Sequence, residues 1–373
     1  MLRPARAGRE LPDFPWDSLA PAAARARAHP DGIVDLSVGT PVDPTPEVVA
    51  EALRAAADAP GYPQTWGTPA LREAVAAWFA RRRGVPGLDP DGVLPTIGSK
   101  ELVAWLPTLL GLGPGDAVAH PRVAYPTYDV GARLAGARPV PVDGVADLPD
   151  DARLVWLNSP SNPTGHVLDV ADMAAVVAWA RERGAVVASD ECYAELGWDE
   201  HLDAARGGLV PSVLDPRVCG GDHSGLLVVY STSKQSNLAG YRAAFVAGDP
   251  ALVADLLQVR KHAGMIVPRP VQAALVAALG DDAHVDAQRE RYRARREVLR
   301  EALGRAGFTV EASGAGLYLW CTRGEPAADS VSWLAERGVL VAPGSFYGAA
   351  GARHVRVALT AGDERVAAAA RRW

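Results

Sequence analysis

Residues 226–234 read Leu-Leu-Val-Val-Tyr-Ser-Thr-Ser-Lys, an apolar and β-branched run that ends in a short polar turn. This pattern predicts a buried strand whose carboxyl end is exposed and carries Lys234. Only Lys100, Lys234 and Lys261 are lysines among the 38 Lys and Arg residues. Arginine cannot replace lysine as an amine nucleophile, because its guanidinium stays protonated. Lys234 is therefore a candidate for a chemical role, although a solvated surface lysine fits the same four residues.

Short apolar runs like this one recur along the middle of the chain. Strands are predicted at 93–97, 117–120, 139–142, 154–157, 185–188, 226–230 and 243–246. Helical periodicity lies between them at 99–110, 126–136 and 170–183. This alternation predicts an α/β fold with a mainly parallel, seven-stranded sheet between helices. Ligands of such sheets bind beyond the carboxyl ends of the strands.

The last third of the chain predicts a smaller α+β domain. Residues 284–306 form an arginine-rich helical run, and its interspersed acids indicate a solvated, salt-paired helix face. Strand-like runs follow at 308–310, 316–320, 339–341 and 354–358. We expect three regions: an N-terminal arm with part of the small domain (1–44), the large domain (45–280) and the C-terminal small domain (281–373).

Composition excludes several classes of function. A net charge of −6 and a pI near 5.8 leave no basic stripe for nucleic acid. Met1–Arg6 is charged without a following apolar segment, and no run of about 18 apolar residues occurs, so we expect a cytoplasmic protein with no membrane partner. Cys192, Cys219 and Cys321 lack metal-ligand spacing, which predicts small buried hydrophobes and no metal site.

Polar residues follow several of the predicted strands. Gly98-Ser99-Lys100 opens a helix, where free N–H groups can bind an anion. Asn162 lies in a Pro-rich turn after 154–157, and Asp190 and Tyr193 follow 185–188. Each feature alone fits an ordinary cap or turn. Together with Lys234, however, an amine, a carboxylate, an amide and an anion site make up the set needed to bind pyridoxal 5'-phosphate.

With these motifs, the chain resembles the fold-type I, pyridoxal-phosphate-dependent class I/II aminotransferases from Gly39 to Arg356. The resemblance is carried by Ser-Asn-Pro-Thr-Gly at 161–165, Asp-Glu-Cys-Tyr at 190–193, Ser-Thr-Ser-Lys at 231–234 with Gly240 and Arg242 after it, and Arg356 on a late strand. It implies a large and a small domain, the cofactor pyridoxal 5'-phosphate, and a homodimer with shared active sites.

The resemblance also implies roles around the cofactor ring. Lys234 would attach to the cofactor and then move the proton of the substrate Cα. Asp190 would pair with the ring nitrogen, and Asn162 and Tyr193 would hydrogen-bond the ring 3-oxygen. Tyr125 would stack on the ring, although a tyrosine in an ordinary βα loop fits the same position.

Further roles concern the phosphate and the substrate. The resemblance assigns the phosphate to the backbone amides of Ser99 and Lys100, to Ser231, Ser233 and Arg242, and to Tyr62 reaching in from the neighbouring subunit. Gly39, Asn162 and Arg356 would receive the α-carboxylate of the substrate. Arg356 suits this task because its planar guanidinium binds carboxylates through two hydrogen bonds.

Within the family, the chain is most similar to the actinobacterial N-succinyl-diaminopimelate aminotransferases, through residues 11–17, 62–63, 98–101, 125–128 and 265–268. This implies amino transfer between glutamate/2-oxoglutarate and an amino-dicarboxylate, N-succinyl-LL-2,6-diaminopimelate, in lysine biosynthesis. Such a substrate needs a second cation at its distal carboxylate, for which Arg269 and His223 are candidates. Three alternatives stay open: an aminotransferase of aspartate, aromatic or histidinol-phosphate type, a pyridoxal-phosphate lyase or decarboxylase, and a non-catalytic sensor of the cofactor.

Overall fold

The computed structural model describes residues 11–198 and 209–373, so Met1–Arg6 lie outside the described residues. Its large sheet has seven strands in the order β2-β8-β7-β6-β5-β3-β4. The strands are β2 (Val93–Ile97), β3 (Ala117–Pro121), β4 (Arg138–Val142), β5 (Ala152–Asn158), β6 (Val186–Asp190), β7 (Leu226–Ser231) and β8 (Ala243–Gly248). β8 runs antiparallel to β2 and β7, and the other neighbouring pairs are parallel. The predicted mainly parallel sheet is confirmed.

Helices cover both faces of this sheet. They are α2 (Glu47–Ala55), α3 (Pro69–Arg82), α4 (Ser99–Leu109), α5 (Thr127–Ala135), α6 (Val170–Arg183), α8 (Pro250–Ala263) and α9 (Arg269–Gly280). Alternate residues of β7 enter two separate cores. Val228 and Tyr230 pack with α3, α6 and α9, whereas Leu227 and Val229 pack with α4, α5 and α8. Because β7 is buried on both faces, its sequence is a continuous apolar run.

Local sequence signals set the ends of these helices. The Thr68 hydroxyl accepts a hydrogen bond from the Leu71 N–H at 3.2 Å at the start of α3. Asp169 caps α6 in the same way, accepting from the Asp172 N–H at 2.8 Å. α6 ends at Gly184, which has a φ of 63°. Side-chain caps satisfy free N–H groups, and glycine adopts the left-handed conformation that ends a helix.

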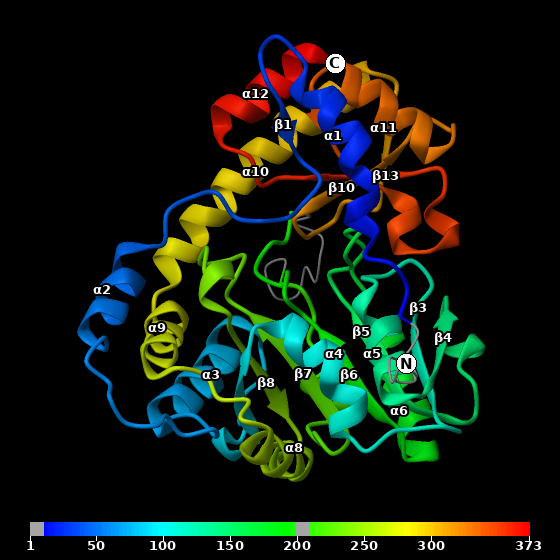
Figure 1. Cartoon of the computed structure of the whole chain (residues 1–373). Helices are drawn as coiled ribbons and strands as arrows, with labels where there is room; N and C mark the ends of the chain where they lie inside the picture. The colour runs from blue at the N-terminus through cyan, green and yellow to red at the C-terminus, as the bar shows by residue number, and fades with distance from the viewer. Residues whose placement is uncertain (1–10, 199–208) are drawn as a thin grey trace, which may run out of the picture.

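A smaller layer lies above the large sheet in Figure 1 and joins both ends of the chain. A four-stranded antiparallel sheet has the order β12-β13-β10-β9, and β1 pairs in parallel with β11. The elements are α1 (Ala20–Arg27), β1 (Val34–Asp35), α10 (Asp282–Arg305), β9 (Thr309–Glu311), β10 (Tyr318–Thr322), α11 (Ala327–Glu336), β11 (Val339–Leu340), β12 (Ala342–Pro343), β13 (Val355–Ala358) and α12 (Asp363–Arg372). One apolar core runs through N-terminal and C-terminal residues. The expected boundaries at 44 and 280 stay predictions.

The strand predicted at 339–341 corresponds to β11, which pairs with β1 and ends at Leu340. The sequence pattern did not predict β12, which follows Val341 directly and pairs with β13 in the other sheet. Periodicity carries no sign of such a change of partner.

The predictions for the arginines of the long helical run and for the three cysteines hold. The arginines of α10 pair along the helix, as Arg293 does with Glu290 and Arg305 with Glu301. Cys192, Cys219 and Cys321 are buried and free. Every helix in the described ranges is too short or too polar to cross a membrane.

Candidate active site

A cavity of about 500 Å³ lies beyond the carboxyl ends of β5, β6 and β7. All of the residues predicted to contact the cofactor or the substrate α-carboxylate, except Tyr62, line it. These residues are Gly39, Ser99, Lys100, Tyr125, Asn162, Asp190, Tyr193, Ser231, Ser233, Lys234, Arg242 and Arg356. Tyr62 does not line the cavity, and its side chain is 99% exposed on the loop between α2 and α3. Segments that are far apart in the sequence therefore meet where strand order predicts a ligand.

Lys234 lies in the polar turn that follows β7. Its Nζ donates a hydrogen bond to the carbonyl oxygen of Gly39. Burial lowers the pKa of the amine below its ordinary value of 10.5; Tyr318 opposes this effect, and Arg356 adds to it. A lysine whose pKa is lowered in this way is suited to accept and return a proton nearer to neutral pH.

Asp190 ends β6, and two donors hold its carboxylate. Oδ2 accepts from the Tyr128 hydroxyl at 2.9 Å, and Oδ1 accepts from the Cys192 N–H at 3.2 Å. Burial raises the pKa of the carboxyl, while the hydrogen bonds from Cys192 and Tyr128 act to lower it. A carboxylate has about four acceptor sites, so Asp190 can accept one further hydrogen bond from a cationic group in the cavity.

An anion site lies at the N-terminal end of α4. Gly98 has a φ of 75°, and a Cβ at this position would lie 2.0 Å from Nη2 of Arg242. Glycine therefore lets the guanidinium of Arg242 lie against the start of the helix. The hydroxyl oxygens of Ser231 and Ser233 are 2.7 Å apart on the same cavity wall. Free N–H groups, hydroxyls and a guanidinium are the donors that phosphate prefers.

Arg356 lies on β13 of the small layer, and its side chain reaches the turn after β5 of the large sheet. Its Nη1 donates to the Asn162 Oδ1 at 2.9 Å, and its Nη2 donates to the Ser37 carbonyl oxygen at 2.7 Å. The guanidinium carbon lies 3.9 Å from the ring centroid of Tyr318. Burial opposes the charge of Arg356, but the surrounding tyrosines outweigh it and the pKa is raised. A fully charged, planar donor pair is thus held at the cavity wall.

A pair of tyrosines lies next to Arg356. The hydroxyl oxygens of Tyr193 and Tyr318 are 3.2 Å apart. Burial raises the pKa of Tyr193 well above 10, whereas Arg356 and Lys234 outweigh burial and lower the pKa of Tyr318. Tyr193 therefore keeps its proton and can donate it in a hydrogen bond, as its predicted role requires.

Sequence reasoning missed several residues of this cavity. Tyr128, Cys192 and Tyr318 line it, as do Phe14 and Trp16 of the N-terminal segment. Tyr128 follows Tyr125 by three residues, a helical spacing that could have placed both on one face. Tyr318 carried no such signal, because its contact with Arg356 depends on the register between β10 and β13.

Comparisons with known proteins agree with this geometry. A profile of the aminotransferase class I and II family matches residues 31–372. The chain belongs to this family. The aminotransferase is 62% identical over 365 residues to the 4-dedimethylamino-4-oxo-anhydrotetracycline transaminase OxyQ of Streptomyces rimosus, covering 98% of this chain and 99% of that relative.

Two other relatives support the same assignment. Over 369 residues, the aminotransferase is 64% identical to the probable aminotransferase Rv1178 of Mycobacterium tuberculosis, covering 98% of this chain and 86% of that protein. The structure of a probable N-succinyldiaminopimelate aminotransferase from Thermus thermophilus superposes with a TM-score of 0.85 at 31% identity, covering 96% and 99% of the two chains. The resemblance inferred from the motifs is confirmed.

Pyridoxal 5'-phosphate is the cofactor of this family, and the cavity of this aminotransferase fits it. Ser99, Ser231, Ser233 and Arg242, which line one wall, would hold the phosphate, and Asp190 would accept a hydrogen bond from the ring nitrogen. Lys234 supplies the amine for covalent attachment. Burial raises the pKa of Tyr125 to about 12, so this cavity-lining ring is uncharged.

A second cavity of about 700 Å³ adjoins the first. The two cavities share Phe14, Trp16, Lys100 and Tyr125 as walls. Neither Arg269 nor His223, the candidates for a distal carboxylate, lines either cavity. Lys100 lines both, with its Nζ 5.4 Å from the ring centroid of Phe14. Lys100 is the cationic residue that lines both cavities, whereas Arg122 and Arg133 line only the second. Sequence reasoning had placed Lys100 only at the phosphate.

Proposed function

We propose that this aminotransferase exchanges an amino group between glutamate/2-oxoglutarate and an amino-dicarboxylate, in particular N-succinyl-LL-2,6-diaminopimelate of lysine biosynthesis. The meeting of Lys234, Asp190 and Arg356 around one cavity supports the reaction type. The three groups match the needs of transamination: a mobile proton acceptor, a fixed anion and an α-carboxylate clamp.

The roles of the residues follow from their contacts. Pyridoxal 5'-phosphate, when bound, supplies an electron sink that stabilises negative charge at the substrate Cα. Lys234 takes the proton from that Cα, because its Nζ lies on a short turn beyond a rigid strand. When the amino group passes to the acceptor, Lys234 returns a proton to the Cα of the new amino acid. Asp190 would accept a hydrogen bond from the ring nitrogen of the cofactor and so keep that nitrogen protonated. Tyr193 and Asn162 would donate hydrogen bonds to the ring 3-oxygen.

Arg356 binds the α-carboxylate of the substrate. Its guanidinium bonds the Asn162 amide oxygen and the Ser37 carbonyl oxygen, which leaves its orientation fixed before the substrate arrives. Donor groups that are already held in place lose less conformational entropy on binding than mobile donor groups. Gly39 allows the substrate to approach the backbone, since it adds no side chain to this wall.

The distal carboxylate of the substrate is proposed to bind Lys100. The Nζ of Lys100 lies over the ring of Phe14, and Lys100 lines both cavities. The adjoining cavity of about 700 Å³ gives space to a substrate longer than aspartate. The similar structure named as a probable N-succinyldiaminopimelate aminotransferase supports the same substrate.

A second candidate acceptor is a fused-ring ketone. It is favoured by the 62% identity to OxyQ, whose name states that it is a transaminase of 4-dedimethylamino-4-oxo-anhydrotetracycline. The second cavity has apolar walls from Phe14, Trp16 and Phe346, which would suit flat rings. Unlike the proposed amino-dicarboxylate, a fused-ring ketone would not need Lys100 as a cation for a distal carboxylate.

One assay separates these possibilities. The purified holoenzyme is given glutamate with the 2-oxo form of N-succinyl-diaminopimelate, oxaloacetate, an aromatic 2-oxo acid, the keto precursor of histidinol phosphate or an anhydrotetracycline ketone. We expect the highest kcat/KM with the first acceptor. A preference for the ring ketone would replace the proposed substrate. A lyase or decarboxylase would instead release ammonia or carbon dioxide without forming 2-oxoglutarate.

We also propose a homodimer in which Tyr62 reaches the phosphate site of the neighbouring subunit. Its side chain is 99% exposed in the single chain, which supports a partner for it. Light scattering should give twice the mass of 39.1 kDa. Tyr62→Phe should weaken cofactor binding while the dimer persists, and a fully active monomer would contradict the shared site.

A further inference from the structure

Glu191 follows Asp190 directly, yet its carboxylate lies outside the cofactor cavity. Glu191 does not line that cavity, and its side chain is 0% exposed. Burying a carboxylate is costly unless it is paired and hydrogen-bonded. The surroundings of Glu191 therefore have to compensate its charge.

Arg83, the residue at the C-terminal end of α3, supplies the counter-charge. Its Nη2 donates to Oε2 of Glu191 at 2.8 Å, and its Nη1 donates to the Val210 carbonyl oxygen at 3.0 Å. The other oxygen of Glu191, Oε1, accepts from the Ser212 hydroxyl at 3.1 Å and from the Val213 N–H at 2.9 Å. These hydrogen bonds are what make a buried ion pair tolerable, and they fix the position of Glu191.

The same turn is also held on its other side. The Glu191 N–H donates to the Val229 carbonyl oxygen of β7 at 3.0 Å. The Cys192 N–H donates to Oδ1 of Asp190 at 3.2 Å. Since Asp190 and Glu191 share one peptide unit, a shift of Glu191 would carry the Asp190 carboxylate with it. Misplacing an active-site group by about 1 Å can cost a hundredfold in rate.

We propose that Arg83 and Glu191 are positioning residues for Asp190. Their ion pair fixes the peptide unit between Asp190 and Glu191, so that the Asp190 carboxylate stays directed at the ring nitrogen of the cofactor. The proposal rests on the role of Asp190 in the proposed function. Arg83 and Glu191 act through Asp190 and touch neither cofactor nor substrate.

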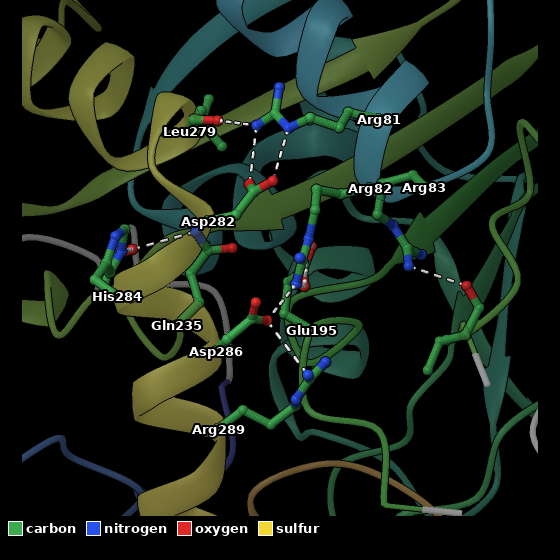
Figure 2. A network of polar contacts seen from close by, with 12 residues as sticks. Arg81, Arg82, Arg83, Glu195, Gln235, Leu279, Asp282, His284, Asp286 and Arg289 are labelled. Atoms are coloured by element: carbon green, nitrogen blue, oxygen red, sulfur yellow. Dashed lines mark hydrogen bonds and ion pairs between the residues drawn. The ribbon is translucent and has the colours of Figure 1, made fainter. Parts of the chain in front are cut away.

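Arg81 provides a matched control on the same helix. In Figure 2, the side chains of Arg81, Arg82 and Arg83 leave the end of α3 in different directions. Arg81 binds both carboxylate oxygens of Asp282, at 2.9 and 3.0 Å, at the start of α10. This pair is partly exposed and does not reach Asp190. Arg81→Met thus removes an arginine and an ion pair without disturbing the turn after β6.

The test compares the parent holoenzyme with the Arg83→Met, Glu191→Gln and Arg81→Met variants. Three quantities are measured: the Kd of pyridoxal 5'-phosphate for the apoprotein, the circular dichroism of the bound cofactor, and kcat and KM with glutamate. In Arg83→Met and Glu191→Gln we expect the Kd to rise roughly tenfold. We further expect kcat to fall by up to about a hundredfold with KM little changed, and the cofactor dichroism to change. Arg81→Met should leave all three at parent values.

Ser212→Ala keeps the ion pair and removes one hydrogen bond from Glu191, so it covers the case in which Arg83→Met does not fold. It should shift the same quantities in the same direction by a smaller amount. A folded Arg83→Met or Ser212→Ala protein with parent Kd, kcat and dichroism would overturn the positioning role.

The Asp190→Asn variant separates the proposed role of Asp190 from the proposed positioning role of Arg83 and Glu191. If Asp190→Asn keeps the parent Kd, the proposed role of Asp190 fails; if it loses cofactor while Arg83→Met does not, only the positioning role fails.

Discussion

The guanidinium of Arg356 donates to the amide oxygen of Asn162 at 2.9 Å, which joins the last strand of the small layer to the turn after β5 of the large sheet. The two residues are 194 positions apart in the chain. The side chain proposed to clamp the substrate is therefore held by a side chain proposed to contact the cofactor, so that substrate and cofactor would be oriented against each other.

Replacing Arg356 by Gln should weaken substrate binding. The variant loses a charge-assisted donor pair for the α-carboxylate, so we expect kcat/KM for glutamate to fall roughly ten- to hundredfold, mainly through KM. Steady-state kinetics with glutamate tests this. Arg305→Gln on the exposed side of α10 is the control and should keep the parent kcat/KM. An unchanged KM in Arg356→Gln would contradict the clamp.

Replacing Lys234 by Ala should abolish the exchange. Loss of a positioned acid–base group costs at least about 10²- to 10⁴-fold. Stopped-flow absorbance of the half-reaction with glutamate measures the rate. Borohydride reduction of the parent followed by mass spectrometry should place the cofactor mass on Lys234 and leave Lys261 unmodified. Turnover at the parent rate in Lys234→Ala would remove its catalytic role.

The direction of the pKa shift of Lys234 can be measured in the apoprotein. Because burial lowers the pKa of its amine, Lys234 loses its proton at a lower pH than an ordinary lysine. The rate of acetylation of Lys234 by acetic anhydride should therefore reach its half-maximum at a lower pH than that of a lysine in a short unstructured peptide. Peptide mass spectrometry across a pH series measures the midpoint for both. Equal midpoints would contradict the shift.

Asp190→Asn should raise the stability of the apoprotein at neutral pH while weakening cofactor binding. Burial raises the pKa of Asp190 in the folded apoprotein above its ordinary value of 3.8, so the ionised form costs stability at neutral pH. This cost disappears as the pH falls below the unfolded value, where both states are protonated. The apo variant should thus have a higher Tm than the parent at pH 7, with a difference that shrinks toward acid, while its affinity for cofactor is lower. A lower Tm at pH 7 would contradict this assignment.

Gly39→Ala should disturb the site through Tyr318. A Cβ at Gly39 would lie 2.1 Å from the Tyr318 hydroxyl oxygen and 2.7 Å from its ring carbon Cζ. We expect a loss of about 1–3 kcal/mol in unfolding free energy, together with a lower kcat/KM. Gly61→Ala is the control, because a Cβ there meets nothing within 4 Å. Chemical denaturation and kinetics of both variants test the prediction, and Gly39→Ala should cost less stability in a Tyr318→Ala background than in the parent.

The strands and the ends that carry Lys234, Asp190 and Asn162 were predictable, because each buried strand is a local apolar run and each functional residue follows it within a few positions. Tyr128 was harder. Its hydroxyl reaches Asp190 only because its ring stacks on Trp156 of β5, with centroids 5.0 Å apart, and a contact between separate elements leaves no periodic signal.

Charge partners were harder still to predict. Arg83 and Glu191 lie 108 positions apart, and the sequence offers many other arginines and acids that could pair. The change of sheet between β11 and β12 likewise depends on which strands lie within reach. The sequence thus specified which chemical groups were present and on which strand ends, while the pairing among them depended on tertiary packing.

The hydrogen bond from Arg356 to the Ser37 carbonyl oxygen joins residues 319 positions apart. During synthesis on the ribosome, all strands of the large sheet are made long before β13. A nascent chain can therefore form most of the cofactor cavity while it still lacks its clamp for the substrate. Translation products that stop before β13 would carry Lys234 and Asp190 yet lack Arg356, so the residue proposed to clamp the substrate α-carboxylate is among the last site residues that the growing chain acquires.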